Sequence, residues 1–578
     1  MTDAPAVLEA AGLSKSFGTG AKRVVALDGV GLRIRTGAIT GLIGPDGAGK
    51  TTFMRLAAGL LAPDGGRISV LGLDATRNAL EVQAALGYMP QRFGLYEDLS
   101  VQENLDLYAD LQGVPRAERA PRYAELMHMT GLAPFTSRLA GRLSGGMKQK
   151  LGLACTLVRA PRLLLLDEPT VGVDPVSRRE LWAIVDRLVT SEGMSVLLST
   201  AYLDEAERCT EVVLLHEGRV LGQGAPATVS ARVAGRTWAV SQPDVRQRDL
   251  QAKLDGQPGI VDALVQGEHV RVVTGAPELP AALTADAGIA ARAVPPRFED
   301  GFIDLQRSRE SPHFRAAAEP ASAAANDHEI VIRVEGVRRR FGEFWAVDGV
   351  DFQIRRGEIF GLLGANGAGK TTTFRMLCGL LPATAGHLEV AGHDLRHAAS
   401  AARQRIGYMS QKFSLYGIMS VRQNLDFFAS TYGLDNADRR ARIAWALAEF
   451  ELADFADAAS ADLPLGFKQR LALACALMHE PEIIFLDEPT SGVDPLARRE
   501  FWRRINALAR HGVTVLVTTH FMEEAEYCDR LAIMAAGKIL ATDEPVAIKS
   551  LARTAEHPAP SMEDAFIRLI ENASGATT

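Results

Sequence analysis

A long internal repeat constrains the fold of this chain more than any other feature of its sequence. Residues 41–61, GLIGPDGAGKTTFMRLAAGLL, match residues 361–381, GLLGANGAGKTTTFRMLCGLL, 320 positions later. Residues 163–175, LLLLDEPTVGVDP, match residues 483–495, IIFLDEPTSGVDP, at the same spacing. Because 578 residues exceed what one hydrophobic core supports, this repeat predicts two copies of one domain.

The spacing of the repeat changes near its end. FEDGFIDL begins at Phe298 and MEDAFIRL at Met562, only 264 positions apart, so the first copy carries about 56 extra residues. Short alternating runs around a helix-like segment predict a small α+β module within 232–297. This insert follows the motifs of the first copy and holds no cluster of reactive side chains. We therefore expect few contacts across its boundary and a chain that folds without it.

Composition and charge exclude several classes of protein. The 63 basic and 70 acidic residues give a net charge of −7, which argues against a nucleic-acid partner. No apolar run reaches about 18 residues, and the first residues lack a signal-peptide pattern, so we expect neither a membrane span nor secretion. The five cysteines lie far from one another and predict reduced, buried thiols in the cytosol, not metal ligands.

Each copy contains a glycine-rich phosphate loop. GPDGAGKTT and GANGAGKTT both fit GxxxxGK(S/T), and each follows a strand-like run and precedes a helical pattern. Backbone N–H groups of such a loop wrap phosphates, the lysine reaches the β- and γ-phosphates, and the first threonine ligates Mg²⁺. The candidate nucleotide-binding residues are Gly44, Gly47, Gly49, Lys50, Thr51 and Thr52 in the first copy and Gly364, Gly367, Gly369, Lys370, Thr371 and Thr372 in the second.

Two adjacent carboxylates end the buried strand that follows in each copy. Asp167 and Asp487 suit a contact with Mg²⁺, and Glu168 and Glu488 are placed to take a proton from an attacking water. A solvated acidic strand end is the alternative, which the phosphate loop upstream disfavours.

A glutamine lies between these two motifs in each copy. Gln91 and Gln411 are candidates to contact Mg²⁺ or the attacking water. The apolar side chains of FGLY and FSLY that follow fit either ordinary packing or docking of a partner. Phe17 and Phe341, upstream of the phosphate loops, fit either stacking on adenine or core packing, and their matched positions favour stacking.

The two copies differ at two further motifs. Ser144, Gly145 and Gly146 of LSGGMKQK begin a helical pattern and form a second phosphate-binding nest. The second copy reads LPLGFKQR, where Pro464 and Leu465 preserve the helix start but impair the anion site. After the last buried strand the second copy has His520, and the first copy has Ala201 in the same phrase.

This order of motifs resembles the nucleotide-binding domain of ABC transporters over residues 5–230 and 328–550. The phrasing resembles the branch that exports drugs or cations through separately encoded membrane subunits, and closest to it are ATPase subunits with two fused domains. The resemblance implies an α/β fold with two tandem phosphate-loop NTPase domains and a small α+β insert. The expected parts are 5–231, a first nucleotide-binding domain; 232–308, an accessory segment with closing helix; 309–328, a linker; 329–550, a second nucleotide-binding domain; and 551–578, a C-terminal helix and tail.

The resemblance also implies that two domains close head to tail on two ATP molecules. Site one then combines the phosphate loop and Glu168 of the first copy with the LPLG of the second. Site two combines Lys370, Glu488 and His520 with the LSGG of the first copy. The substitutions Asp46, Ala201, Pro464 and Leu465 all fall in site one. We therefore expect site two to hydrolyse ATP and site one to bind it and turn it over slowly.

The expected partners are two integral membrane permease subunits, which hold the contacts to a small-molecule substrate and place the chain at the cytoplasmic face of the inner membrane. Nucleic acid is not an expected partner. The main alternative is a soluble twin ATPase acting on ribosomes, for which a long basic helical linker would be expected. A DNA clamp is a third alternative, disfavoured because sustained heptads and cysteine pairs are missing from the sequence.

Overall fold

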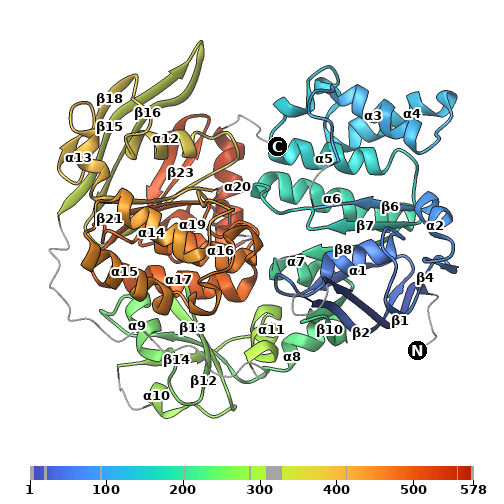
Figure 1. Ribbon diagram of the computed structural model, residues 1–578, viewed down its shortest axis with the longest axis horizontal. Coiled ribbons are helices and arrows are strands. Elements are labelled where there is room, and N and C mark those ends of the chain that lie inside the picture. Colours follow the sequence, from blue (N-terminus) through green and yellow to red (C-terminus); the bar gives the residue numbers. More distant parts are fainter. Residues whose placement is uncertain are drawn as a thin grey trace. The chain divides into compact units, whose positions relative to one another are not determined.

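The computed structural model describes residues 6–18, 23–91, 94–200, 202–284, 288–307, 329–411, 413–555 and 557–573. The chain forms two compact units (Figure 1). The first comprises Met1–Arg232 with Arg297–Phe302, and the second comprises Val233–Pro296 with Ile303–Thr578. The expected linker and Ala201 lie outside the described residues. Among the described helices, none has the length and apolar character needed to cross a membrane.

A six-stranded, mainly parallel sheet forms the centre of the first unit, in the order β10-β9-β3-β8-β7-β6. Its inner strands read as unbroken apolar runs, such as LLLLD and SVLLST, and every residue of these strands is buried. That pattern is expected where helices cover both faces of a parallel sheet. The strands are β3 (Ile39–Ile43), β6 (Leu86–Met89), β7 (Leu163–Asp167), β8 (Ser195–Thr200), β9 (Glu211–His216) and β10 (Arg219–Gly224).

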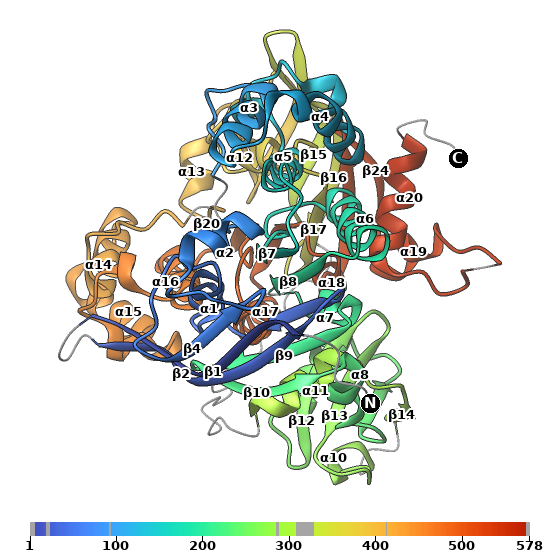
Figure 2. The ribbon, with the colours of Figure 1, turned by 90° about the vertical axis from the view of Figure 1, so that its right-hand side faces the viewer.

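An antiparallel sheet of order β2-β1-β4-β5 packs beside this core, and α1 lies in the same hydrophobic cluster through Phe53 and Leu56. Its strands are β1 (Ala6–Phe17), β2 (Val24–Arg35), β4 (Gly65–Val70) and β5 (Leu73–Asp74). The helices of the unit are α1 (Lys50–Ala57), α2 (Ala79–Ala85), α3 (Val101–Leu111), α4 (Arg116–Thr130), α5 (Gly145–Thr156), α6 (Pro175–Glu192), α7 (Leu203–Arg208) and α8 (Pro226–Ala231). In Figure 2, α3, α4 and α5 form a helical subdomain apart from the sheets.

The second unit repeats this architecture, with sheets ordered β20-β21-β22-β17-β23-β24 and β16-β15-β18-β19. Its strands are β15 (Ile330–Phe341), β16 (Phe344–Arg355), β17 (Ile359–Gly364), β18 (Ala385–Val390), β19 (His393–Asp394), β20 (Ile406–Met409), β21 (Ile483–Asp487), β22 (Thr514–Thr519), β23 (Arg530–Ala535) and β24 (Lys538–Asp543). Its helices are α12 (Lys370–Leu377), α13 (Ala399–Arg403), α14 (Val421–Thr431), α15 (Asn436–Glu449), α16 (Leu465–Ala476), α17 (Pro495–Arg510), α18 (Met522–Ala525), α19 (Pro545–Ser550) and α20 (Met562–Ala573).

The insert has its own small sheet, ordered β12-β13-β11-β14, with a core that includes Val240, Leu250 and Val272. Its elements are β11 (Thr237–Ser241), α9 (Gln247–Leu254), β12 (Ile260–Gln266), β13 (His269–Thr274), α10 (Ala281–Thr284) and β14 (Ala290–Ala293). The closing helix α11 (Phe298–Arg307) follows it, and the division between the two units falls within this helix.

The insert packs tightly on α17 of the second unit. The buried Asp262 forms ion pairs with Arg499 and, at 3.2 Å, with Arg503, and both arginines lie on α17. Arg248 of α9 pairs with Asp529 at 2.6 Å. The expectation that few contacts cross the boundary of the insert is therefore wrong. An alternating pattern predicted the module, but the sequence shows no sign of which neighbour its charged side chains meet.

Candidate functional site

Both phosphate loops connect a buried central strand to the start of a helix. In the first unit the loop joins β3 to α1, and Gly49 stands immediately before the helix with a φ of 100°. A side chain at Gly49 would collide with the carbonyl oxygen of Ala26, so this position requires glycine. The ammonium of Lys50 donates to the carbonyl oxygens of Gly44 and Pro45 at 2.8 and 3.0 Å, across the mouth of the loop.

The second loop has the same geometry between β17 and α12. Gly369 has a φ of 106°, and the ammonium of Lys370 donates to the carbonyl oxygens of Gly364 and Ala365 at 2.6 and 3.2 Å. Both lysines are buried, so each loop holds a desolvated positive charge at the N-terminus of a helix. Such an arrangement binds phosphate.

The two carboxylates of the first unit lie at the end of β7, beside the phosphate loop. Glu168 is 3.6 Å from the Lys50 ammonium and accepts a hydrogen bond of 2.5 Å from the Gln91 amide. Asp167 accepts from the hydroxyl of Ser199 at 2.7 Å, and its second oxygen is buried with no hydrogen-bond partner among the described residues. The structure thus brings together the glutamine, the lysine and both carboxylates, as the sequence predicted.

The corresponding cluster of the second unit contains one more group. Glu488 lies 4.0 Å from Lys370 and accepts from Gln411 at 2.6 Å. His520, which follows β22, places its Nδ1 3.3 Å from the same carboxylate. The Nε2 of this buried ring has no hydrogen-bond partner among the described residues. A buried polar atom of this kind fits an oxygen of a bound ligand.

The histidine changes the protonation behaviour of the neighbouring glutamate. Burial raises the pKa of Glu168 above its ordinary value, and the opposing Lys50 charge does not offset this. Burial also acts to raise the pKa of Glu488, but His520 and Lys370 outweigh it, so the net shift is downward. The second unit therefore holds the stronger tendency toward an ionised carboxylate at this position.

Both glutamates also adopt an unusual backbone conformation. Glu168 has a φ of 52° and Glu488 a φ of 46°, a backbone conformation that residues other than glycine rarely adopt. Each N–H donates into the next strand, to Ser199 in the first unit and Thr518 in the second. Backbone strain of this kind is typical of functional positions.

The LSGG and LPLG segments begin equivalent helices with different chemistry. Ser144 stands before α5, and its hydroxyl accepts from the N–H of Met147 at 3.3 Å. Pro464 stands before α16 in the same extended conformation, with no side-chain cap. The fold therefore tolerates proline there, just before the helix and not within its first turn. Gly146 has no room for a side chain, because a Cβ would collide with Ser177.

The aromatic residues Phe17 and Phe341 lie at the ends of β1 and β15. Their exposed fractions are 44% and 46%, so neither ring is part of a core. A cation flanks each ring, with Lys15 5.7 Å from the centroid of Phe17 and Arg339 4.7 Å from that of Phe341. The core-packing alternative is therefore wrong for both, and the rings are free to stack on a ligand.

In the segment after Gln411, the structure supports the packing alternative for two of the apolar side chains. Phe413 and Leu415 pack against the core of the helical subdomain, so they are not available as docking anchors. Tyr416 is 47% exposed, and Ile418 is 96% exposed. Ile418 was not among the candidates predicted from the sequence, although its counterpart in the first copy is Asp98 and this contrast marks it. In the first copy Tyr96 is exposed, while Phe93 lies outside the described residues.

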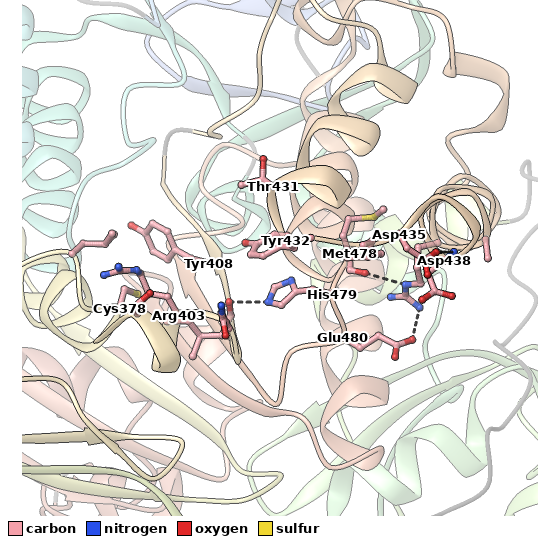
Figure 3. A pocket seen from close by; sticks show the side chains of 18 residues that line it. Cys378, Arg403, Tyr408, Thr431, Tyr432, Asp435, Asp438, Met478, His479 and Glu480 are labelled. Atoms are coloured by element: carbon pink, nitrogen blue, oxygen red, sulfur yellow. Dashed lines mark hydrogen bonds and ion pairs between the residues drawn. The ribbon is translucent and has the colours of Figure 1, made fainter. Parts of the chain in front are cut away.

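A groove opens between the core and the helical subdomain of each unit. In the second unit its volume is 1170 Å³, and Figure 3 shows His479 lying flat on Tyr432, with ring centroids 3.6 Å apart. The ring also contacts the carbonyl oxygen of Ile406 at 3.1 Å, and burial lowers the pKa of His479 to about 4. The charged side chains that line this groove include Arg403, Asp435, Asp438, Arg442 and Glu480.

The groove of the first unit has a different surface. Its volume is 310 Å³, and it presents Leu80 and Leu111, with exposed fractions of 81% and 71%. The second unit has Ser400 and Thr431 at the matching positions. The first groove therefore has two exposed leucines where the second has a serine and a threonine, although both grooves mix apolar and polar residues.

The comparisons with known proteins agree with this geometry. A family model described as ABC transporter matches residues 27–171 and 347–491. The chain is 51% identical over 571 residues to the "Probable multidrug ABC transporter ATP-binding protein YbhF" of Escherichia coli, covering 98% of each chain. It is 43% identical over 216 residues to the "Nod factor export ATP-binding protein I" of Ralstonia nicotianae, which covers 37% of this chain and 67% of that one.

Among solved structures, the "Structure of ATP binding subunit of ABC transporter" is 27% identical with a TM-score of 0.38, over 42% of this chain and 99% of that one. The family model covers both copies of the repeat, and the Escherichia coli relative spans nearly the whole chain. The family model and this relative confirm the resemblance drawn from the order of motifs. The chain belongs to the ABC transporter family, as an ATP-binding subunit that carries two ABC domains and couples ATP hydrolysis to transport.

Proposed function

We propose that this chain is the ATPase subunit of a multidrug exporter, with two unequal ATP sites. The name of its Escherichia coli relative supports the class of substrate, since 51% identity extends over 98% of both chains. Cations remain a second candidate substrate class from the sequence phrasing alone. We propose the domain limits expected from the sequence, except that the insert, 233–296, folds with the second unit.

Each site would take Mg²⁺ together with ATP. Carboxylate and hydroxyl oxygens are the ligands that Mg²⁺ prefers, and Asp167 offers a buried oxygen that has no hydrogen-bond partner in the described chain. We assign Thr51 and Asp167 to the metal in the first copy and Thr371 and Asp487 in the second. Bound Mg²⁺ would neutralise charge on the phosphates during transfer.

We assign hydrolysis to site two, formed by the second phosphate loop and the LSGG segment. The ionised Glu488 takes the proton of the attacking water, while Lys370 and the N–H groups of the loop hold the phosphates. Gln411 holds the carboxylate through its amide, at 2.6 Å. His520 keeps that carboxylate ionised and presents its free Nε2 to a ligand oxygen.

Site one, in this proposal, binds ATP and hydrolyses it poorly. The first copy has Ala201 where the second copy has His520. Burial raises the pKa of Glu168, which disfavours the ionised form of the candidate base. Pro464 lacks the hydroxyl that Ser144 provides, and Leu465 adds a side chain where the first copy has glycine. Losing one preorganised donor typically lowers a rate about 10²- to 10³-fold.

The observation that carries this proposal is the contact of 3.3 Å between the Nδ1 of His520 and the Glu488 carboxylate, because the first copy has alanine at the matching position 201. The test compares Glu488→Gln with Glu168→Gln in the full chain, each removing one carboxylate from a matched position. We expect Glu488→Gln to lower ATP turnover at least about 100-fold and Glu168→Gln to leave more than about half of it. Equal losses in the two variants would contradict the asymmetry of the sites, and no loss in either would contradict their role.

We further propose that two different membrane subunits dock on the chain, one per groove, and hold it at the cytoplasmic face of the inner membrane. The leucine-lined groove of the first unit fits a loop with an apolar side chain. The groove of the second unit fits a loop with charged and polar side chains. The substrate then contacts the membrane subunits and not this chain.

A further inference from the structure

A buried carboxylate behind His520 has no part in the chemistry described above. Glu524 lies on the short helix α18, and its side chain is completely buried. It accepts a short hydrogen bond from the hydroxyl of Thr490 and one of 2.6 Å from the hydroxyl of Thr519. A buried carboxylate is costly unless hydrogen-bonded, so its contacts should be strong and well oriented.

These contacts fix both neighbours of His520. Thr519 precedes the histidine, and its hydroxyl oxygen also accepts from the N–H of Phe521, which follows the histidine, at 2.9 Å. The other partner, Thr490, lies two residues after the proposed base Glu488. One carboxylate therefore joins the strand end that carries the histidine to the turn that carries the base.

Arg498 of α17 extends this network toward the turn before that helix. Its guanidinium is 3.8 Å from the Glu524 carboxylate and donates to the carbonyl oxygen of Val493 at 3.3 Å. It also lies over the ring of Phe521, 4.2 Å from the centroid. The residue after the histidine is therefore held from two sides.

The first unit contains the same frame without the histidine. Glu205 accepts from Thr170 and Thr200 at 3.0 and 2.6 Å. Its third partner is the indole N–H of Trp182 at 3.0 Å. Because Ala201 replaces the histidine, Glu205 has the same anchoring contacts but no catalytic ring beside it.

We propose that Glu524 is a positioning residue for ATP hydrolysis, which sets His520 against Glu488 by fixing Thr490 and Thr519. The inference rests on the proposed roles of Glu488 and His520. The competing explanation is that Glu524 only stabilises the local fold. The first unit provides the control, since a purely structural role would make Glu205 equally important.

The test measures the turnover of Mg²⁺-ATP by the full chain in Glu524→Gln, Glu205→Gln, His520→Ala and the double variant Glu524→Gln/His520→Ala. Glutamine keeps the size of the side chain, and the threonine hydroxyls can reorient toward it. We expect Glu524→Gln to lower kcat about 10- to 100-fold with KM for ATP changed less than about two-fold. In the His520→Ala background the same change should lower kcat less than about two-fold further, because the residue it positions is gone.

Glu205→Gln should leave kcat within about two-fold of the parent. A second pair keeps the test independent of folding: Thr519→Ser retains the hydroxyl and should retain activity, while Thr519→Val removes it and should reproduce the loss of Glu524→Gln. Equal losses with and without His520, or equal losses at Glu205 and Glu524, would overturn the inference. If Glu488→Gln leaves turnover intact, the proposed function fails first; if it abolishes turnover while Glu524 acts independently of His520, only this inference fails.

Discussion

At the scale of single residues, the contrast between the two catalytic clusters predicts a pH dependence. Glu488 must be ionised to accept a proton, and its pKa is held below the ordinary 4.5. Turnover should therefore fall only as the pH drops below that range. In His520→Ala the group that lowers the pKa is removed while burial remains, so the pKa should rise and the acid limb of kcat should move to higher pH.

The measurement is kcat against pH for the parent and for His520→Ala, with Glu168→Gln as the matched control. The control should keep the acid limb of the parent, because Glu168 does not carry turnover in the proposed mechanism. An acid limb that stays in place when the histidine is removed would contradict the electrostatic role of His520.

The sequence predicted individual site residues best, because a phosphate-loop motif leaves few alternative roles for its residues. Lys50, Glu168 and Gln91 are close together, as the order of motifs predicted. The direction of the pKa shift at Glu488 could not be predicted, since it depends on a 3.3 Å contact between groups 32 residues apart. Glu524 was also missed, because a glutamate in an acidic helix looks solvated until its burial is known.

At the scale of elements, the helix starts at Ser144 and Pro464 predict how site one could be restored. Both residues precede a twelve-residue helix in the same extended conformation, so serine can replace proline without a change of backbone. The variant Ala201→His/Pro464→Ser/Leu465→Gly should regain hydrolysis in a Glu488→Gln background. Single reversions should regain little, because groups that act on one transition state are not additive.

The readout is ATP turnover of the triple variant against its three single variants, all with Glu488→Gln. Glu168→Gln added to the triple variant provides the control and should abolish the regained activity. A triple variant as inactive as the single ones would contradict the head-to-tail composition of site one.

The loop after Gln411 predicts an apolar contact with the same membrane subunit that docks in the groove of the second unit, because Tyr416 packs on Phe427 of α14 and the end of that helix lines this groove. Tyr416 and Ile418 are its exposed apolar side chains, and large exposed side chains of this kind dominate interfaces. Tyr416→Glu/Ile418→Glu should release the chain from membranes that contain its permease subunits, with ATP affinity unchanged. Phe413→Glu serves as a contrast: it should destabilise the helical subdomain, since Phe413 packs on its core. A double variant that stays membrane-bound would show that this loop is not needed for docking.

At the scale of the whole molecule, the insert behaves as part of the second unit although the first copy of the repeat encodes it. The alternation of apolar residues made its existence predictable, and a core around Val240 and Leu250 confirms a folded module. Its attachment could not be predicted, because that depends on charged side chains from α9, β12 and α17. Asp262 and Arg499 lie 237 positions apart in the sequence, and no local pattern pairs them.

The buried ion pair of Asp262 and Arg499 predicts how strongly this attachment stabilises the second unit. Arg499 is buried, burial lowers its pKa to about 10, and its guanidinium forms an ion pair with the buried Asp262 carboxylate. Removing one partner of a buried pair typically costs about 3–5 kcal/mol, because the other charge stays buried. Asp262→Ala should therefore lower the free energy of unfolding of the second unit by about that amount, and deletion of 234–296 with a Gly/Ser bridge by more.

Denaturant unfolding of the full chain measures this, and two variants of the same interface act as controls. Asp249→Ala removes a more exposed pair, in which Arg510 lies 3.4 Å away, and should cost less than about 1 kcal/mol. Arg499→Met in the Asp262→Ala background should recover stability, because it removes a buried charge that has lost its ion pair with Asp262. If Asp262→Ala costs no more than Asp249→Ala, the insert is a separable module after all. In that case ATP binding by the second unit should survive the deletion, as the sequence alone suggested.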